Sequence, residues 1–141
     1  MDCDLLVKNG RVVSAEGIDA ADVAVKDGRV AALLAPHVRD GVRAAQVLDA
    51  EGRLVMPGAI DVHAHLNDPG FTWREDFAHG TAAAAAGGVT TVVDMPLQNE
   101  PALTDAAIFA RKFEAVRDEA LVDYAFWGGL TGDNLDKMRA L

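Results

Sequence analysis

The first 56 residues carry short runs of apolar and β-branched residues that are interrupted by turn-forming pairs. These pairs are Asn9-Gly10 within residues 4–14, Asp27-Gly28 within residues 21–34, and Glu51-Gly52 within residues 46–56. Such a pair between two apolar runs is typical of a β-hairpin. The pattern therefore predicts three short antiparallel units, which together indicate a small β-sandwich domain over residues 1–56.

From residue 57 onward the pattern changes to alternating strands and helices. Strand-like runs at residues 59–66, 90–95 and 122–130 alternate with helical patterns at 76–88, at 105–120 and from 133 onward. This alternation predicts an α/β fold with a parallel sheet, either open and doubly wound or closed as a (β/α)₈ barrel. A barrel needs about 250 residues, and no capping residue ends the last helical pattern. We therefore expect residues 57–141 to be the first three βα units of a TIM barrel, truncated here.

The helical patterns also predict their own ends and faces. Asp76 is the expected N-cap of the first helix, and Thr104 is the expected N-cap of the second. In the second helix, the residues that fall on one face are Phe109, Phe113, Val116 and Ala120.

Composition and charge exclude several classes of function. Half of the 141 residues are hydrophobic and a quarter are charged, which is typical of a globular protein. The net charge of −9, with Lys and Arg scattered singly, leaves no basic stripe for nucleic acid. No apolar run approaches the roughly 20 residues of a membrane helix, and the acidic start is unlike a signal peptide. We expect a cytoplasmic protein without nucleic-acid or membrane partners.

The stretch from Asp61 to His65 is the most informative part of the sequence. Alternate residues of a strand share a face, so His63 and His65 are expected to reach one metal ion from the end of the first barrel strand. An ordinary strand with two part-buried histidines is the alternative. Because a catalytic zinc usually takes three protein ligands, the remaining ligands must come from elsewhere. His37 and His79 are expected to be solvated side chains.

Several stretches resemble one known group of enzymes. Residues 57–65 look like the signature with which amidohydrolases pass from a small β domain into a metal-bearing barrel, and residues 66–70 are similar to the continuation in dihydroorotases and allantoinases. The resemblance extends through residues 80–97, 101–104 and 126–130. It is closest to allantoinases, because Asn67 stands where dihydroorotases usually carry the arginine that grips a substrate carboxylate.

The resemblance implies a binuclear metal centre, usually zinc, although other divalent metals are possible. His63 and His65 would hold the more buried ion, a carboxylated lysine from a later strand would bridge both ions, and a bridging hydroxide would attack the ring carbonyl. No catalytic residue is expected within these residues. Asn67, Gln98 and Asn99 are the candidate substrate contacts, although allantoinases commonly have Asn then Ser where Gln98 and Asn99 stand.

The resemblance further implies a hydrolase that opens a small cyclic ureide, most simply allantoin to allantoate, and that assembles as a tetramer or dimer. A dihydroorotase and a hydantoinase or dihydropyrimidinase are alternatives within the same enzyme class. A non-catalytic scaffold with the same fold is a second alternative, and a complete small domain is a third. If the sequence is a fragment, it should be inactive alone.

Overall fold

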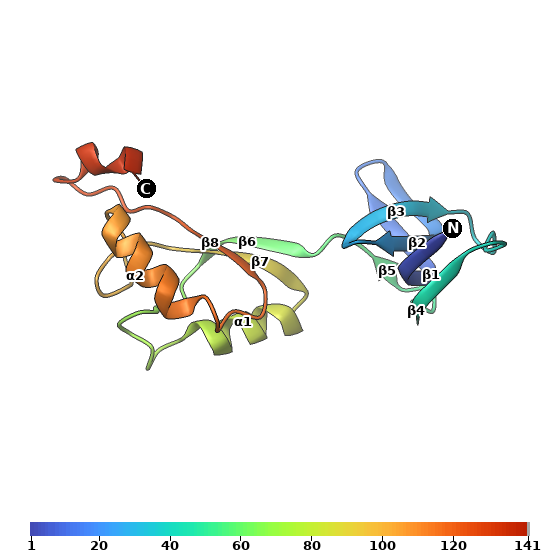
Figure 1. The fold of residues 1–141 in the computed structure, drawn as a ribbon, viewed down its shortest axis with the longest axis horizontal. Helices are drawn as coiled ribbons and strands as arrows, with labels where there is room; N and C mark the ends of the chain where they lie inside the picture. Colours follow the sequence, from blue (N-terminus) through green and yellow to red (C-terminus); the bar gives the residue numbers. More distant parts are fainter. Residues whose placement is uncertain (141) are drawn as a thin grey trace. The chain divides into compact units, whose positions relative to one another are not determined.

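The structure is a computed structural model, and it describes residues 1–140. The chain forms two compact units, Met1–Pro57 and Gly58–Leu141 (Figure 1). The expected domains, 1–56 and 57–141, differ from these units by one residue. No helix among the described residues is long and apolar enough to cross a membrane.

The first unit contains one five-stranded sheet. Its strands are β1 (Asp2–Ser14), β2 (Gly17–Lys26), β3 (Arg29–Leu34), β4 (Arg43–Asp49) and β5 (Leu54–Val55). The order is β3-β2-β1-β4, and β5 also pairs with β1. β1 runs antiparallel to β2 and parallel to both β4 and β5. The described residues of this unit thus supply one layer, and the β-sandwich stays a prediction.

The expected hairpin at Asn9-Gly10 is wrong, because β1 passes through this pair as one strand. The pairing of β1 with β2 shifts register here, and Asn9 has a φ of 57°. The Asn9 backbone N–H donates to Asp22 at 2.7 Å, and its side-chain amide donates to Asp49 at 2.9 Å. These partners from two neighbouring strands stabilise a bulge where the local sequence favours a turn.

The other two turn-forming pairs do form turns. Asp27-Gly28 joins the antiparallel strands β2 and β3, which confirms that hairpin. Glu51-Gly52 joins β4 to β5, and both residues have a positive φ. The expectation of a third antiparallel unit at residues 46–56 is nevertheless wrong, because β4 and β5 each pair with β1 in the parallel sense.

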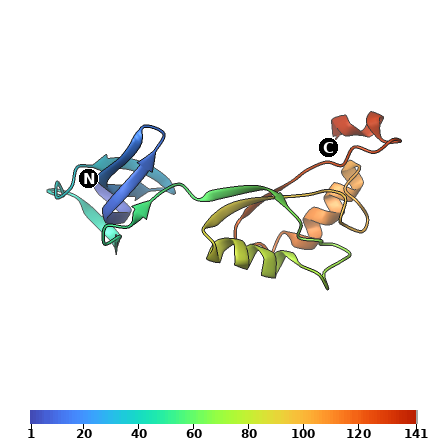
Figure 2. The ribbon, with the colours of Figure 1, turned by 180° about the vertical axis from the view of Figure 1, so that it is seen from behind.

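The second unit repeats strand and helix around a three-stranded parallel sheet with the order β6-β7-β8 (Figure 2). Its elements are β6 (Ala59–Ala64), α1 (Phe77–Ala86), β7 (Val89–Asp94), α2 (Ala106–Val116), β8 (Asp123–Phe126) and the 3₁₀ helix η1 (Leu135–Ala140). One buried cluster joins α1, α2 and the sheet through Leu66, Phe77, Val92 and Val116. The predicted order of strands and helices is confirmed, and the closed barrel stays a prediction.

One expected helix cap and one expected helix type are wrong. Asp105 caps α2 in place of Thr104, because the Asp105 carboxylate accepts from the backbone N–H groups of Ala107 and Ile108. The helix expected from residue 133 is a 3₁₀ helix, and its last expected residue, Leu141, lies outside the described residues. The expected N-cap of α1 is confirmed, since Asp76 accepts from the backbone N–H of His79.

The buried face of α2 differs from its apolar pattern. Phe109 and Phe113 remain 39% and 42% exposed, whereas Lys112 and Val116 are buried. α2 is oriented so that the Lys112 side chain faces the sheet. The reason lies in the polar groups at the ends of the strands, which supply partners for that cation.

Phe77 should be the residue on which the stability of the second unit depends most. It is fully buried and meets Tyr124 and Phe126 edge to face, with ring centroids 5.5 and 6.0 Å apart. We predict that Phe77→Ala lowers the free energy of unfolding by about 3–5 kcal/mol, measured by urea denaturation. Phe109→Ala is the control, and its loss should be clearly smaller because Phe109 is already partly hydrated. Equal losses would contradict the packing described here.

Candidate functional site

His63 and His65 lie together at the carboxyl end of β6. His63 is in the strand and His65 directly follows its last residue, Ala64. Their ring centroids are 5.2 Å apart, and both side chains are exposed. The neighbouring Asp61 carboxylate accepts from the His63 backbone N–H at 3.0 Å, so it supports the strand beside the pair. Two accessible imidazoles at this separation can turn toward one metal ion.

The histidine pair does not by itself make a complete metal site. Within residues 1–140 no group of three or more His, Cys, Asp or Glu side chains is arranged to hold a metal. Imidazole nitrogens suit zinc and other divalent transition metals, so the donor type fits although the number of donors does not. Any such ion would need further ligands from outside the described residues.

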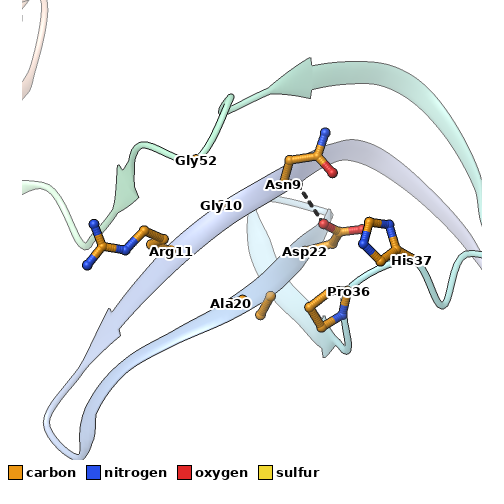
Figure 3. A pocket seen from close by; sticks show the side chains of 9 residues that line it. Asn9, Gly10, Arg11, Ala20, Asp22, Pro36, His37 and Gly52 are labelled. Atoms are coloured by element: carbon orange, nitrogen blue, oxygen red, sulfur yellow. Dashed lines mark hydrogen bonds between the residues drawn. The ribbon is translucent and has the colours of Figure 1, made fainter.

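The other two histidines have different surroundings. His79 lies in the first turn of α1, where its ring nitrogen is 2.9 Å from the Asp76 carboxylate. This hydrogen bond raises the pKa of His79. His37 belongs to the first unit, where it is exposed at the edge of a cavity of about 230 Å³ (Figure 3).

The cavity beside His37 is built around a carboxylate that already has partners. Asp22 accepts from the Asn9 backbone N–H, drawn in Figure 3, and from Arg39 Nε at 2.6 Å. The hydrogen bond from Arg39 holds the pKa of Asp22 below its usual value, against the opposing effect of burial. These polar groups are engaged in holding the bulge of β1 and the loop after β3.

The segment that follows His65 is buried and polar. Asn67 is 7% exposed and has a φ of 54°. Its side-chain Oδ1 is buried without a hydrogen-bond partner among the described residues. Asp68 is also buried, and burial raises the pKa of its carboxyl group. This buried acceptor, two residues from His65, has bonding capacity that no described residue uses.

The remaining two sequence candidates lie in the loop after β7 and differ from each other. Gln98 is exposed. Asn99 is 3% exposed, and both ends of its amide are engaged: Nδ2 donates to the Met95 carbonyl at 2.9 Å, and Oδ1 accepts from Lys112 Nζ at 2.6 Å. For Asn99 to contact a substrate, its amide would have to break the hydrogen bonds with Met95 and Lys112.

Lys112 and Asp94 are the residues near this site that the sequence reasoning missed. Lys112 Nζ donates to Asp94 Oδ2, to Asn99 Oδ1 and to the Asp68 carbonyl oxygen at 2.9 Å. It also lies 5.0 Å from the ring centroid of Phe126. The sequence signal for this pair is a lysine within the apolar stripe of a helix. A lysine in that position is buried only when it is paired, so it indicates a buried acidic partner.

The three strand ends are tied together around Asp94. Its Oδ1 accepts from the Leu66 backbone N–H at 2.7 Å, and its carbonyl oxygen accepts from the Trp127 backbone N–H at 3.0 Å. The Trp127 indole N–H reaches the Val62 carbonyl of β6 at 2.9 Å. The loops that follow β6, β7 and β8 are thereby held close to the histidine pair.

Comparison with known proteins identifies related sequences over nearly the whole chain. The sequence model described as the amidohydrolase family matches residues 54–137. An allantoinase from Desulfitobacterium hafniense is 45% identical over 98% of this chain and 30% of its own length. An allantoinase from Rubrobacter xylanophilus is 46% identical over the same shares. The chain thus spans about 30% of the length of these curated relatives.

Solved structures of similar fold include L-hydantoinase (dihydropyrimidinase) from Arthrobacter aurescens. It aligns with a TM-score of 0.90 at 39% identity, over 97% of this chain and 30% of its own. A D-hydantoinase from Bacillus sp. AR9 aligns with a TM-score of 0.75 at 33% identity, over 96% of this chain and 30% of its own.

The two buried asparagines near this site, Asn67 and Asn99, should respond differently to substitution. Asn67→Gly should change the free energy of unfolding by about 1 kcal/mol or less, because glycine tolerates the positive φ and no hydrogen bond is lost. Asn99→Ala should cost about 1.5–3 kcal/mol, because a hydrogen bond from a buried ammonium disappears. Urea denaturation of both variants measures the difference. A loss for Asn67→Gly as large as for Asn99→Ala would show that Asn67 has a structural partner.

Proposed function

The chain belongs to the amidohydrolase family, and we propose that the protein containing it hydrolyses the C–N bond of a cyclic ureide, opening allantoin to allantoate. The observation that carries the proposal is the adjacent His63 and His65 pair at the end of β6, in a chain 45% identical over 98% of its length to an allantoinase. Because the chain spans about 30% of that relative, the activity is proposed for the whole protein. The described residues alone should be inactive.

His63 and His65 are the proposed ligands of a divalent metal, with zinc as the first candidate and a binuclear centre as the expected form. Such a metal lowers the pKa of a bound water toward neutrality and polarises a carbonyl. The described residues contribute two imidazole donors on one short segment. The other ligands, including a bridging lysine, are proposed to lie outside these residues.

Asn67 is the proposed substrate contact within the described residues. Cyclic ureides carry ring N–H donors, and the Asn67 Oδ1 is an acceptor that lacks a partner there. Gln98 remains a second candidate because it is exposed in the loop after β7. Asn99 is better explained as a support for Lys112, because both ends of its amide already have a partner.

The rest of the architecture is also a proposal. We propose that the second unit is the beginning of a TIM barrel and that the first unit is half of a β-sandwich. An apolar groove of about 420 Å³ on the first unit, lined in part by Val30, Leu33 and Met56, supports a covering second layer from the rest of the protein. A cytoplasmic location and a homo-oligomer, tetramer or dimer, remain predictions.

A hydantoinase is the second candidate function, because the L-hydantoinase aligns with a TM-score of 0.90. A dihydroorotase is less favoured, since Asn67 offers no positive charge to a substrate carboxylate. A non-catalytic scaffold would have no need for the retained His63 and His65. Measurement of the metal content of the complete protein separates an enzyme from such a scaffold.

Removing either proposed ligand should abolish metal binding and turnover. His63→Ala and His65→Ala in the complete protein should each weaken zinc binding by more than about 100-fold, since loss of an outer-shell partner already costs about 10–100-fold. Allantoin hydrolysis should fall with the zinc content. Competition with a chelator and a turnover assay measure the two effects.

The control for these variants is His79→Ala. His79 is exposed and paired with Asp76, so its loss should leave zinc binding within about twofold of the parent protein. Zinc binding that survives in both His63→Ala and His65→Ala would disprove the assignment.

Asn67→Arg should separate the candidate substrates. Replacing the acceptor with a cation should lower kcat/KM for allantoin by about 10–100-fold, because a substrate N–H would lose its partner. A hydantoin should be affected in the same direction, whereas dihydroorotate, which carries a carboxylate, should be turned over better than by the parent protein. Thr72→Arg, on an exposed position of the same loop, controls for added charge. Unchanged values for all three substrates would remove Asn67 from the site.

A further inference from the structure

Lys112 is a buried cation whose bonding capacity is fully used. Its side chain is 1% exposed, and an ammonium group has three protons to donate. The three acceptors are the Asp94 carboxylate, the Asn99 amide oxygen at 2.6 Å and the Asp68 carbonyl at 2.9 Å. Burial lowers the pKa of Lys112, and the attraction of Asp94 opposes that change. The lysine therefore connects α2 to the loops that follow two different strands.

Asp94 uses its second carboxylate oxygen on the segment that follows His65. While Oδ2 pairs with Lys112, Oδ1 accepts from the Leu66 backbone N–H at 2.7 Å. On the other side of His65, the Ala64 carbonyl accepts from the Met95 backbone N–H at 2.8 Å. The main chain is thus held on both sides of His65 by Asp94, the last residue of β7, and by Met95, which follows it.

Lys112 and Asp94 together hold both ends of the three residues that follow His65. Asp94 binds the N–H of Leu66 at the start of this segment, and Lys112 binds the carbonyl of Asp68 at its end. An ion pair that contributed only stability would need neither bond to this segment. The buried charge pair therefore helps to fix the path of the main chain directly after β6.

We propose that Lys112 and Asp94 are positioning residues that fix the backbone at Leu66 and so hold the His65 imidazole in its orientation. The role rests on the proposed function, because it matters for chemistry only if His65 is a metal ligand. Outer-shell partners that orient a ligand typically change metal affinity by about 10–100-fold when they are removed. Lys112 acts from α2, and its side chain is buried whereas the histidine pair is exposed.

Two double variants of the complete protein test the contact from Asp94 to Leu66, and comparison of K112M/D94N with the parent protein tests the contribution of Lys112. K112M/D94N and K112M/D94L both remove the two buried charges, which avoids leaving one charge unpaired. The D94N substitution retains an acceptor for the Leu66 N–H, whereas D94L does not. The probes are Co²⁺, through its affinity and its visible absorption, and hydrogen exchange of the peptide that contains Leu66.

We expect K112M/D94L to bind Co²⁺ about 10–100-fold more weakly than K112M/D94N. Its Co²⁺ absorption bands should change, and the Leu66 amide should exchange faster. Equal Co²⁺ affinity and equal exchange in the two variants would overturn the proposal. If either double variant fails to fold, Asp94→Glu keeps the charge pair while displacing the acceptor from Leu66. Unchanged Co²⁺ affinity in that variant would also overturn it.

Failure of the proposed function gives a different result. If the parent protein binds neither Co²⁺ nor zinc, the metal assignment of His63 and His65 is wrong. The exchange of the Leu66 amide still decides the positioning role in that case, because it requires no metal. Faster exchange in K112M/D94L than in K112M/D94N supports the fixing of the backbone at Leu66 by Asp94, and equal exchange overturns it.

Discussion

The buried ammonium of Lys112 is the constraint around which the second unit is organised. Removing an ammonium from water costs several kcal/mol, and this cost is offset only when each proton finds an acceptor. The acceptors here come from Asp68, Asp94 and Asn99, in the segments that follow β6 and β7. Because each partner is needed, these segments cannot move independently. The rings of Phe77 and Phe126, whose centroids lie 5.5 and 5.0 Å from Nζ, complete the surroundings of the charge.

This constraint links an ordinary helix to the end of the strand that carries the histidine pair. α2 covers one face of the sheet, yet its buried lysine bonds to the loops at the carboxyl ends of the strands, where active-site groups of such sheets are found. The same contacts explain why Asn99 is buried although it lies in an exposed loop next to Gln98. A polar residue in that loop is therefore not automatically a substrate contact.

The features predictable from the sequence are those that depend on local spacing. The alternation of strands and helices and the shared face of His63 and His65 follow from periodicity alone. Asn9 shows where local spacing is insufficient, because both a bulge and a hairpin turn accept a residue with a positive φ. The bulge forms here because Asp22 and Asp49, on two other strands, accept hydrogen bonds from Asn9. The burial of Lys112 likewise depends on Asp94, 18 positions earlier in the sequence. Distant partners of this kind leave only a weak local signal.

The buried polar side chains near the carboxyl ends of β6 and β7 are of two kinds: some have hydrogen-bond partners, and one acceptor has none. Those of Lys112, Asp94 and Asn99 satisfy one another, as buried polar groups in stable folds do. The Oδ1 of Asn67 has no partner among the described residues, although it lies between the held positions Leu66 and Asp68. This acceptor is itself buried, so a donor from outside the described residues reaches it only where the surrounding segment moves. The contrast leaves Asn67, and not Asn99, with an acceptor available for a new partner.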